Sequence, residues 1–120
     1  MYIHYFKGKI ILDPNSGTLY TSFMRIISRK TLKDFWEQHA DSRQSLQAWY
    51  ADAKQADWKS PADIKNYYRN ASFLSNNRIV FNIKGNKYRL VVAINYNISI
   101  VYIRFVGTHQ EYDKIDAAMI

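Results

Sequence analysis

Cysteine is absent from this sequence of 120 residues, which removes disulfides, thiolate chemistry and cysteine-based zinc sites together. The four glycines are scattered, so no glycine-rich phosphate loop is present. No apolar run approaches the roughly 20 residues needed to span a bilayer, and the N-terminus lacks an apolar signal-peptide region. These absences favour a cytoplasmic protein without a membrane anchor.

Acidic residues are missing from a long stretch of the chain. None occurs between Asp63 and Glu111, and the net charge is +7, from 17 Lys and Arg against 10 Asp and Glu. Seven basic residues lie in the same stretch: Lys65, Arg69, Arg78, Lys84, Lys87, Arg89 and Arg104. A segment with one sign of charge attracts polyanions and speeds their encounter, so nucleic acid is the first partner to consider. A merely soluble basic surface is the simpler alternative.

Clustered metal ligands are also lacking. The three histidines, His4, His39 and His109, lie in unrelated segments, and no serine sits in a nucleophile elbow. We therefore expect no metal ion and no other cofactor.

Helical periodicity marks the first half of the chain. Thr31 with Asp34 is typical of a helix start, and a second helix is predicted from about Ser42 to Ala56. Ser60 followed by Pro61 signals the start of a third, short helix. A short strand is predicted at 24–28, before the first helix.

Alternating apolar and polar residues then predict three strands, at about 78–84, 87–96 and 100–106. The alternation assigns one face to apolar residues that pack on helices, including Phe81, Leu90, Ile103 and Phe105. The other face holds polar and basic residues and is expected to be open, with these members: Arg78, Val80, Asn82, Lys84, Arg89, Val91, Ala93, Asn95, Ile100, Tyr102, Arg104 and Val106. The fold class is therefore α+β, an antiparallel-rich sheet covered on one face by N-terminal helices.

A capping box of Thr108 and Glu111 predicts a short C-terminal helix that runs to about Ala118, with His109 at its first position. Residues 1–23 fit this plan poorly, although 10–12 has the composition of a strand. We expect them to be an N-terminal extension or leader, with Met24 as an alternative start.

RNA cleavage suits the side chains that are present. The ribose 2′-hydroxyl can act as nucleophile, so the protein needs to align it, move protons and stabilise charge on phosphorus. Arg89 and Arg104 are candidate guanidinium clamps for the phosphate, and His109 is a candidate proton carrier. The simpler readings are a solvated sheet face for both arginines and a surface or capping role for His109.

Other candidates have equally plain alternatives. Tyr112 on the last helix suits proton transfer or core packing, and Asp113 suits the same chemistry or a favourable helix-end charge. Tyr102 on the basic face suits stacking on a base, as in single-stranded RNA recognition.

Four segments together resemble the HigB toxin family of the wider RelE superfamily: NRIVFNI at 77–83, GNKYRLV at 85–91, YIR at 102–104 and GTHQEYD at 107–113. The resemblance covers about residues 24–118, so 24–120 is expected to be one RelE-like domain. It implies a toxin of a type II toxin–antitoxin system that cleaves mRNA in the ribosomal A site. Its implied partner is a HigA-type helix-turn-helix antitoxin, through which alone it would reach operator DNA.

The resemblance also implies roles for particular residues. Arg89 aligns with the superfamily's phosphate-binding arginine, and His109 falls where relatives place a catalytic Arg or His. Tyr112 or Asp113 approximates the terminal catalytic contributor. Val80 and Asn82 stand where RelE has catalytic lysines, which leaves nearby basic and polar residues as RNA contacts: Arg78, Asn82, Lys84, Lys87 and Tyr102.

Two other classes of function fit the same basic face. One is a non-catalytic module that binds RNA or the ribosome, and the other is an interaction domain that docks an acidic protein. Cleavage of translated mRNA that depends on Arg89 or His109 separates the enzyme from both.

Overall fold

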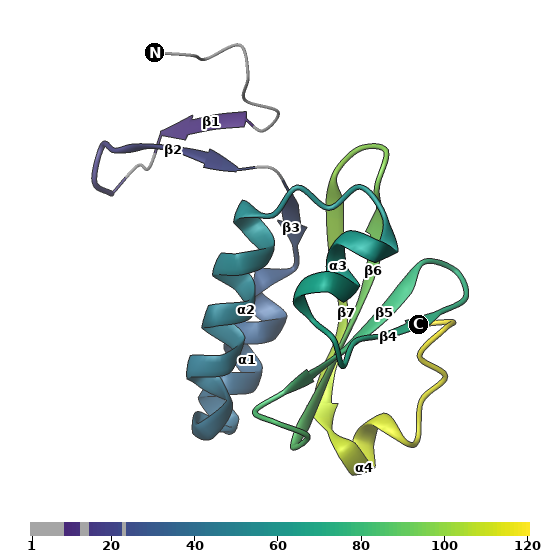
Figure 1. Cartoon of the computed structure of the whole chain (residues 1–120). Helices are drawn as coiled ribbons and strands as arrows, with labels where there is room; N and C mark the ends of the chain where they lie inside the picture. Colours follow the sequence, from purple (N-terminus) through teal and green to yellow (C-terminus); the bar gives the residue numbers. More distant parts are fainter. Residues whose placement is uncertain (1–8, 13–14, 23) are drawn as a thin grey trace.

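A computed structural model describes residues 9–12, 15–22 and 24–120 of the chain (Figure 1). The elements in chain order are β1 (Lys9–Leu12), β2 (Leu19–Ser22), β3 (Arg25–Ile27), α1 (Arg29–Gln38), a 3-10 turn η2 (Ala40–Ser42), α2 (Arg43–Gln55), α3 (Pro61–Tyr67), β4 (Ser72–Leu74), β5 (Arg78–Ile83), β6 (Tyr88–Asn95), β7 (Ile100–Thr108) and α4 (His109–Tyr112). The predicted α+β class is confirmed, and the architecture is consistent with a RelE-like fold.

The main sheet has five strands in the order β3-β7-β6-β5-β4. The first strand, β3, is parallel to β7, and the other neighbours are antiparallel. Asn76 and Asn77 both have positive φ, of 60° and 57°, and form the tight turn between β4 and β5, as suits asparagine in a primed hairpin turn. The sequence analysis predicted no strand between the third helix and residue 78 and so missed β4.

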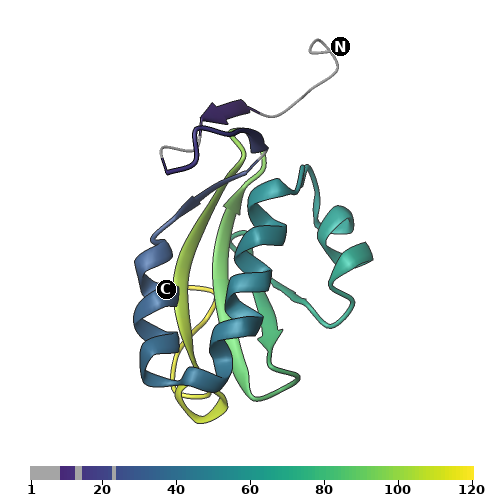
Figure 2. The same ribbon diagram turned by 90° about the vertical axis from the view of Figure 1, so that its left-hand side faces the viewer.

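The helices bury their apolar faces against one side of the sheet (Figure 2). Leu32 from α1, Leu46 and Trp49 from α2 and Ile64 from α3 join a single buried cluster with strand residues. The strand residues in that cluster include Ile79, Phe81, Ile83, Leu90, Val92, Ile94, Val101 and Ile103. The apolar faces that the helical and strand periodicities predict therefore pack together in one core.

Two predicted helix ends are wrong. The first helix begins at Arg29 after Ser28, so Thr31 lies inside the first turn, where its N–H donates to the Ser28 carbonyl at 3.0 Å. The C-terminal helix is only four residues long, although its predicted Thr108–Glu111 capping box is present. Because the chain leaves the helix after Tyr112, the segment that follows takes an irregular path.

A bulge in β7 corrects the predicted sheet faces. Val92 pairs with Ile103 but Val91 pairs with Phe105, so Arg104 is an extra residue in β7. An extra residue exchanges the faces of everything beyond it. Phe105 therefore packs on the outer face, away from the helices, and Val106 packs on the helix side, the reverse of the prediction.

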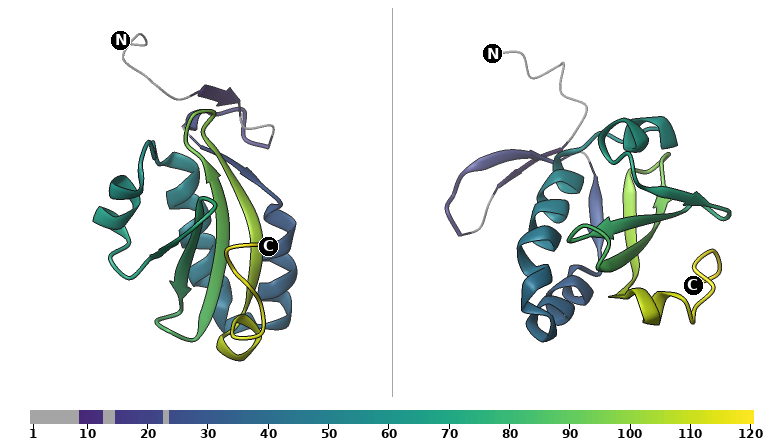
Figure 3. Two further views of the ribbon diagram at one scale, coloured as in Figure 1. Left: turned by 90° about the vertical axis from the view of Figure 1, so that its right-hand side faces the viewer. Right: turned by 60° about the horizontal axis from the view of Figure 1, so that its bottom comes forward.

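The outer face is also not open, as the sequence analysis expected. The segment after α4 crosses the sheet on the side turned away from α1 and α2, as Figure 3 shows in yellow. A second apolar cluster forms there, consisting of Val80, Val91, Ala117, Leu74, Phe105, Tyr112, Ile115 and Ile120. The sequence analysis assigned Val80 and Val91 to the polar face, where they are apolar exceptions. These two residues are the ones that the C-terminal segment covers.

Near the N-terminus, β1 and β2 form a separate antiparallel hairpin. The predicted strand at 10–12 falls within β1. Residues 1–8, 13, 14 and 23 lie outside the described residues, and His4 is among them.

Candidate functional site

Arg89 lies on β6, on the outer face, where it pairs across the sheet with Asn82 of β5 and Gly107 of β7. The side chain is half-buried, and Nη1 donates to the Asn86 carbonyl oxygen at 2.8 Å and to the Tyr88 carbonyl oxygen at 3.2 Å. A guanidinium has five N–H donors, so these bonds hold one edge of the group and leave donors for a phosphate. Arg89 is thus a positioned cation rather than a loose surface charge.

His109 is the first residue of α4, directly after β7. Its Nδ1 lies 3.2 Å from Oδ2 of Asp113, one helical turn later, and both side chains are more than half exposed. The carboxylate is within hydrogen-bonding distance of Nδ1, so it can help to orient the exposed ring. Arg89 and His109 are brought to the same end of the sheet, because Arg89 pairs with Gly107.

The capping box holds this short helix in place. Thr108 Oγ1 accepts from the Glu111 N–H at 3.1 Å, and Glu111 Oε1 accepts from the Thr108 N–H at 2.8 Å. These bonds to Thr108 lower the pKa of Glu111, and the nearby His39 contributes a smaller electrostatic effect. The charged carboxylate of Glu111 therefore holds Thr108, the residue directly before His109.

The two remaining catalytic candidates differ in their surroundings. Arg104 is exposed at the bulge of β7. Tyr112 is half-buried and packs in the outer apolar cluster with Val80 and Val91. The ring of Tyr112 therefore contributes to packing on the outer face.

Among the candidate RNA contacts at this end, Lys84 is exposed at the β5–β6 turn with φ 54°. Asn82 donates from Nδ2 to Asn86 Oδ1 at 3.1 Å. Lys87 instead forms an ion pair with Asp41, and hydrogen bonding to Asp41 raises the pKa of Lys87. Lys84 is thus the lysine better placed to meet an external anion.

The other two RNA candidates lie toward the opposite end of the sheet. Arg78 donates from Nε to the Ile120 oxygen at 2.8 Å, with a further bond from Nη2, and from Nη1 to the Asn76 carbonyl at 2.9 Å. Tyr102 is half-buried on the outer face, opposite Ala93. Arg78 is therefore engaged in anchoring the C-terminal segment.

Sequence reasoning missed the role of Asp41, which accepts hydrogen bonds from Lys87 and from the Tyr88 hydroxyl. The Lys87 bond is the main cause of a lowered pKa for Asp41, and the Tyr88 bond adds to it. His39 stacks on Phe35 with ring centroids 4.2 Å apart, next to Tyr88. No local pattern signals this cluster, because Asp41 and Tyr88 are 47 residues apart in sequence.

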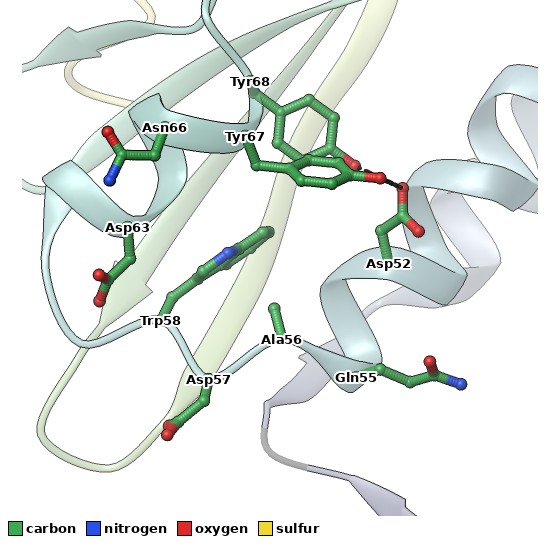
Figure 4. A pocket seen from close by; sticks show the side chains of 9 residues that line it. All are labelled: Asp52, Gln55, Ala56, Asp57, Trp58, Asp63, Asn66, Tyr67 and Tyr68. Carbon is green, nitrogen blue, oxygen red and sulfur yellow. Dashed lines mark hydrogen bonds between the residues drawn. The ribbon is translucent and has the colours of Figure 1, made fainter.

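A pocket of about 400 Å³ lies elsewhere, between the end of α2 and α3 (Figure 4). Asp52, Asp57 and Asp63 line it together with Tyr67 and Tyr68, and both tyrosine hydroxyls donate to Asp52. Burial and the neighbouring Asp52 raise the pKa of Tyr68. An acidic lining repels phosphate, so this pocket does not extend the basic site.

In the described ranges, no three His, Asp or Glu side chains gather as a metal site requires. No helix in the same part of the chain is long and apolar enough to cross a membrane.

Arg89, Lys84 and His109 make one end of the sheet basic. The chain is thus a small α+β protein with a surface that suits a polyanionic ligand. Residues 42–115 match the model of the HigB toxin family, described as the RelE-like toxic component of a toxin–antitoxin system, so the chain belongs to that family. It is 32% identical to the mRNA interferase toxin HigB of Escherichia coli K12 over 97 residues, 78% of this chain and 92% of that protein. The same figures hold for mRNA interferase HigB of Shigella flexneri. The namesake from Escherichia coli O6:H1 is 24% identical over 94 residues, 77% of this chain and 91% of that protein.

Proposed function

We propose that this protein is an mRNA interferase, a toxin that cleaves mRNA by using the RNA's own 2′-hydroxyl and that needs no metal ion. Membership of the HigB toxin family and the names of its curated relatives support this assignment. The observation that carries it is the pairing of Arg89 with Gly107, two residues before His109. That register brings Arg89 to the same end of the sheet as His109, which supports a site where a cation binds the phosphate and an imidazole moves protons.

The arginines bind and polarise the scissile phosphate. Arg89 uses the guanidinium donors that its backbone bonds leave over, and Arg104 approaches from the exposed bulge of β7. Bidentate contacts of this kind stabilise the additional negative charge that builds on the phosphoryl oxygens in the transition state.

The reaction requires two proton transfers. The 2′-hydroxyl gives up its proton and its oxygen attacks phosphorus, while the bond from phosphorus to the 5′ oxygen breaks and that oxygen takes up a proton. The products are a 2′,3′-cyclic phosphate and a 5′-hydroxyl. His109 performs one transfer, and Asp113, 3.2 Å from its ring, or Tyr112 assists.

The neighbouring polar groups hold the RNA strand. Lys84 and Asn82 contact it near the cut, and Tyr102 stacks on a base farther along. Lys87 and Arg78 are bonded to other parts of the chain and contribute mainly to the positive field.

Within this proposal the toxin acts in the cytoplasm, in the ribosomal A site, on messages under translation. A HigA-type helix-turn-helix antitoxin silences it and links it to operator DNA. The test compares cleavage of one message in a translating extract and as naked RNA. Cleavage of naked RNA at an equal rate would contradict ribosome dependence.

The decisive variants are Arg89→Ala, Arg89→Lys and His109→Ala. Losing a charged donor to the transition state costs about a hundredfold in rate, and losing a proton carrier costs about a hundred- to ten-thousandfold. Arg89→Lys keeps the charge but lacks the planar fork, so we expect a clear loss of rate here as well.

Controls match each change with an exposed neighbour outside the site. Arg43→Ala on α2 removes an equal charge, and Gln110→Ala alters the position next to His109. Both should cleave at about the original rate. Binding without cleavage by the unaltered protein would favour an RNA-binding or protein-docking module instead.

A further inference from the structure

A second pocket, of about 430 Å³, opens at the end of the outer face opposite to Arg89. It lies where the β4–β5 turn meets the β6–β7 turn, and four asparagines and two half-buried tyrosines dominate its lining: Asn76, Asn77, Asn95, Asn97, Tyr96 and Tyr102. No acidic residue lines it. Its chemistry is therefore amide and aromatic.

The turns hold these amides in defined positions. Asn77 adopts φ 57° in the β4–β5 turn, and Asn95 Oδ1 accepts from the N–H groups of Asn97 at 3.1 Å and Ile98 at 3.3 Å. Asn76 is committed to the C-terminal segment, because its Nδ2 donates to the Ala118 carbonyl at 2.9 Å. The side-chain amides of Asn77 and Asn97 have no hydrogen-bond partner in the described part of the chain and are exposed.

Nucleobases match this set of groups. An asparagine amide offers a donor and an acceptor side by side, which suits the edge of a base, and a tyrosine ring offers a stacking surface. Arg78 also lines the pocket, but its guanidinium is bonded to Ile120 and Asn76. The pocket is thus better suited to a base than to a phosphate.

The pocket is within reach of RNA held at the cleavage end. Arg89 and Ala93 lie four residues apart on β6, about 13 Å at the usual rise of a strand. Stacked nucleotides advance about 3.4 Å each, so roughly four of them span that distance. The outer apolar cluster includes Val80 of β5, Val91 of β6 and Phe105 of β7, whereas Arg104 at the bulge of β7 is exposed and offers a cation between the cleavage end and Tyr102.

We propose that this pocket binds one nucleobase of the message, about four nucleotides or fewer from the cut, and so sets the sequence preference of the toxin. The inference rests on the proposed mRNA cleavage. Asn77 and Asn97 read the base edge, and Tyr102 stacks on its ring.

The test maps new 5′ ends on messages after induction of the unaltered toxin and of Asn77→Gly, Asn97→Ala and Tyr102→Phe variants. Glycine at position 77 keeps the left-handed turn and removes only the amide. Asn66→Ala, an exposed asparagine of α3 outside this pocket, is the matched control.

We expect the preference for one base near the cut to fall roughly fivefold or more in the two asparagine variants, the lower end of the discrimination that a bidentate amide contributes. Tyr102→Phe retains the ring and should retain the preference, whereas Tyr102→Leu should lower the rate at every site. The Asn66→Ala profile should match the unaltered toxin.

Unchanged base frequencies around the cuts in both asparagine variants would overturn this inference and leave mRNA cleavage standing. The inference would also be overturned if these variants cut messages as the unaltered toxin does but bind the antitoxin more weakly. That result would make the pocket a protein-docking site. If the unaltered toxin makes no cuts at all, the proposed function itself fails.

Discussion

Gly107 is the position where a single added methyl group tests the packing beside the site. A Cβ there would lie 2.5 Å from Cζ of Phe105 and 3.1 Å from its Cε1. Ordinary carbon contacts are about 3.5 to 4.0 Å, so Gly107→Ala displaces the ring by roughly 1 Å. Because Phe105 belongs to the outer apolar cluster, the ring has packed neighbours that resist this displacement.

Two effects of opposite sign determine the outcome of Gly107→Ala. Reduced entropy of the unfolded chain favours alanine by about 0.4 to 1 kcal/mol, whereas overpacking costs about 1 to 3 kcal/mol. We expect overpacking to win and lower the free energy of unfolding by about 1 to 2 kcal/mol. For a chain of this length that is a fall in Tm of roughly 4 to 8 °C.

The assay is urea denaturation of Gly107→Ala in the original chain and in a Phe105→Leu background. Leucine lacks the two ring atoms nearest the added Cβ, so the penalty should shrink by about 0.5 kcal/mol or more. An equal penalty in both backgrounds would refute the steric argument. Cleavage by Gly107→Ala should also fall, because Gly107 lies between Arg89 and His109.

Three further outcomes are expected. The interactions that lower the pKa of Asp41 stabilise the fold above the ordinary aspartate pKa near 4, and this stability is lost as the pH falls through the lowered pKa. Urea titrations should therefore show Asp41→Asn destabilised at neutral pH and approaching the stability of the original protein as the pH falls below 4. Thr108→Ala should lower the free energy of unfolding by about 1 kcal/mol and reduce cleavage by loosening His109, whereas Thr108→Ser should do neither. Equal cleavage by the original protein and both variants would show that the helix cap does not position the site. A chain that begins at Met24 should fold by circular dichroism and cleave mRNA, because the buried cluster, as far as the structure describes it, consists of residues from Met24 onward. An unfolded product would assign residues 1–23 to the folding unit.

Elements with strong local patterns were predicted well from the sequence. The second helix was expected at 42–56 and occurs as Arg43–Gln55, and the three long strands lie within two residues of their predicted ends. The Thr108–Glu111 capping box was likewise visible, because its donors and acceptors are three residues apart. The candidate pair of Arg89 and His109 also came from the sequence, and their common location at one end of the sheet depends on strand register.

Other features depend on contacts that no local pattern encodes. The bulge at Arg104 arises from how β6 and β7 align, and one extra residue was enough to exchange the faces of Phe105 and Val106. The cover over Val80 and Val91 comes from a segment that local propensity alone would have continued as a helix.

By itself, the sequence determined the α+β class, the helix and strand periods, the basic stretch without acidic residues and the residues that resemble the HigB family, because each is written in neighbouring positions. The tertiary structure alone decided which cations are bonded to distant parts of the chain. Arg78 and Lys87 are held by Ile120 and Asp41, partners more than 40 residues away, whereas Arg89 is bonded to nearby backbone carbonyls, at the same end of the sheet as His109. Hydrogen bonds between distant segments depend on how the chain packs, so no local pattern could distinguish Arg78 and Lys87 from Arg89.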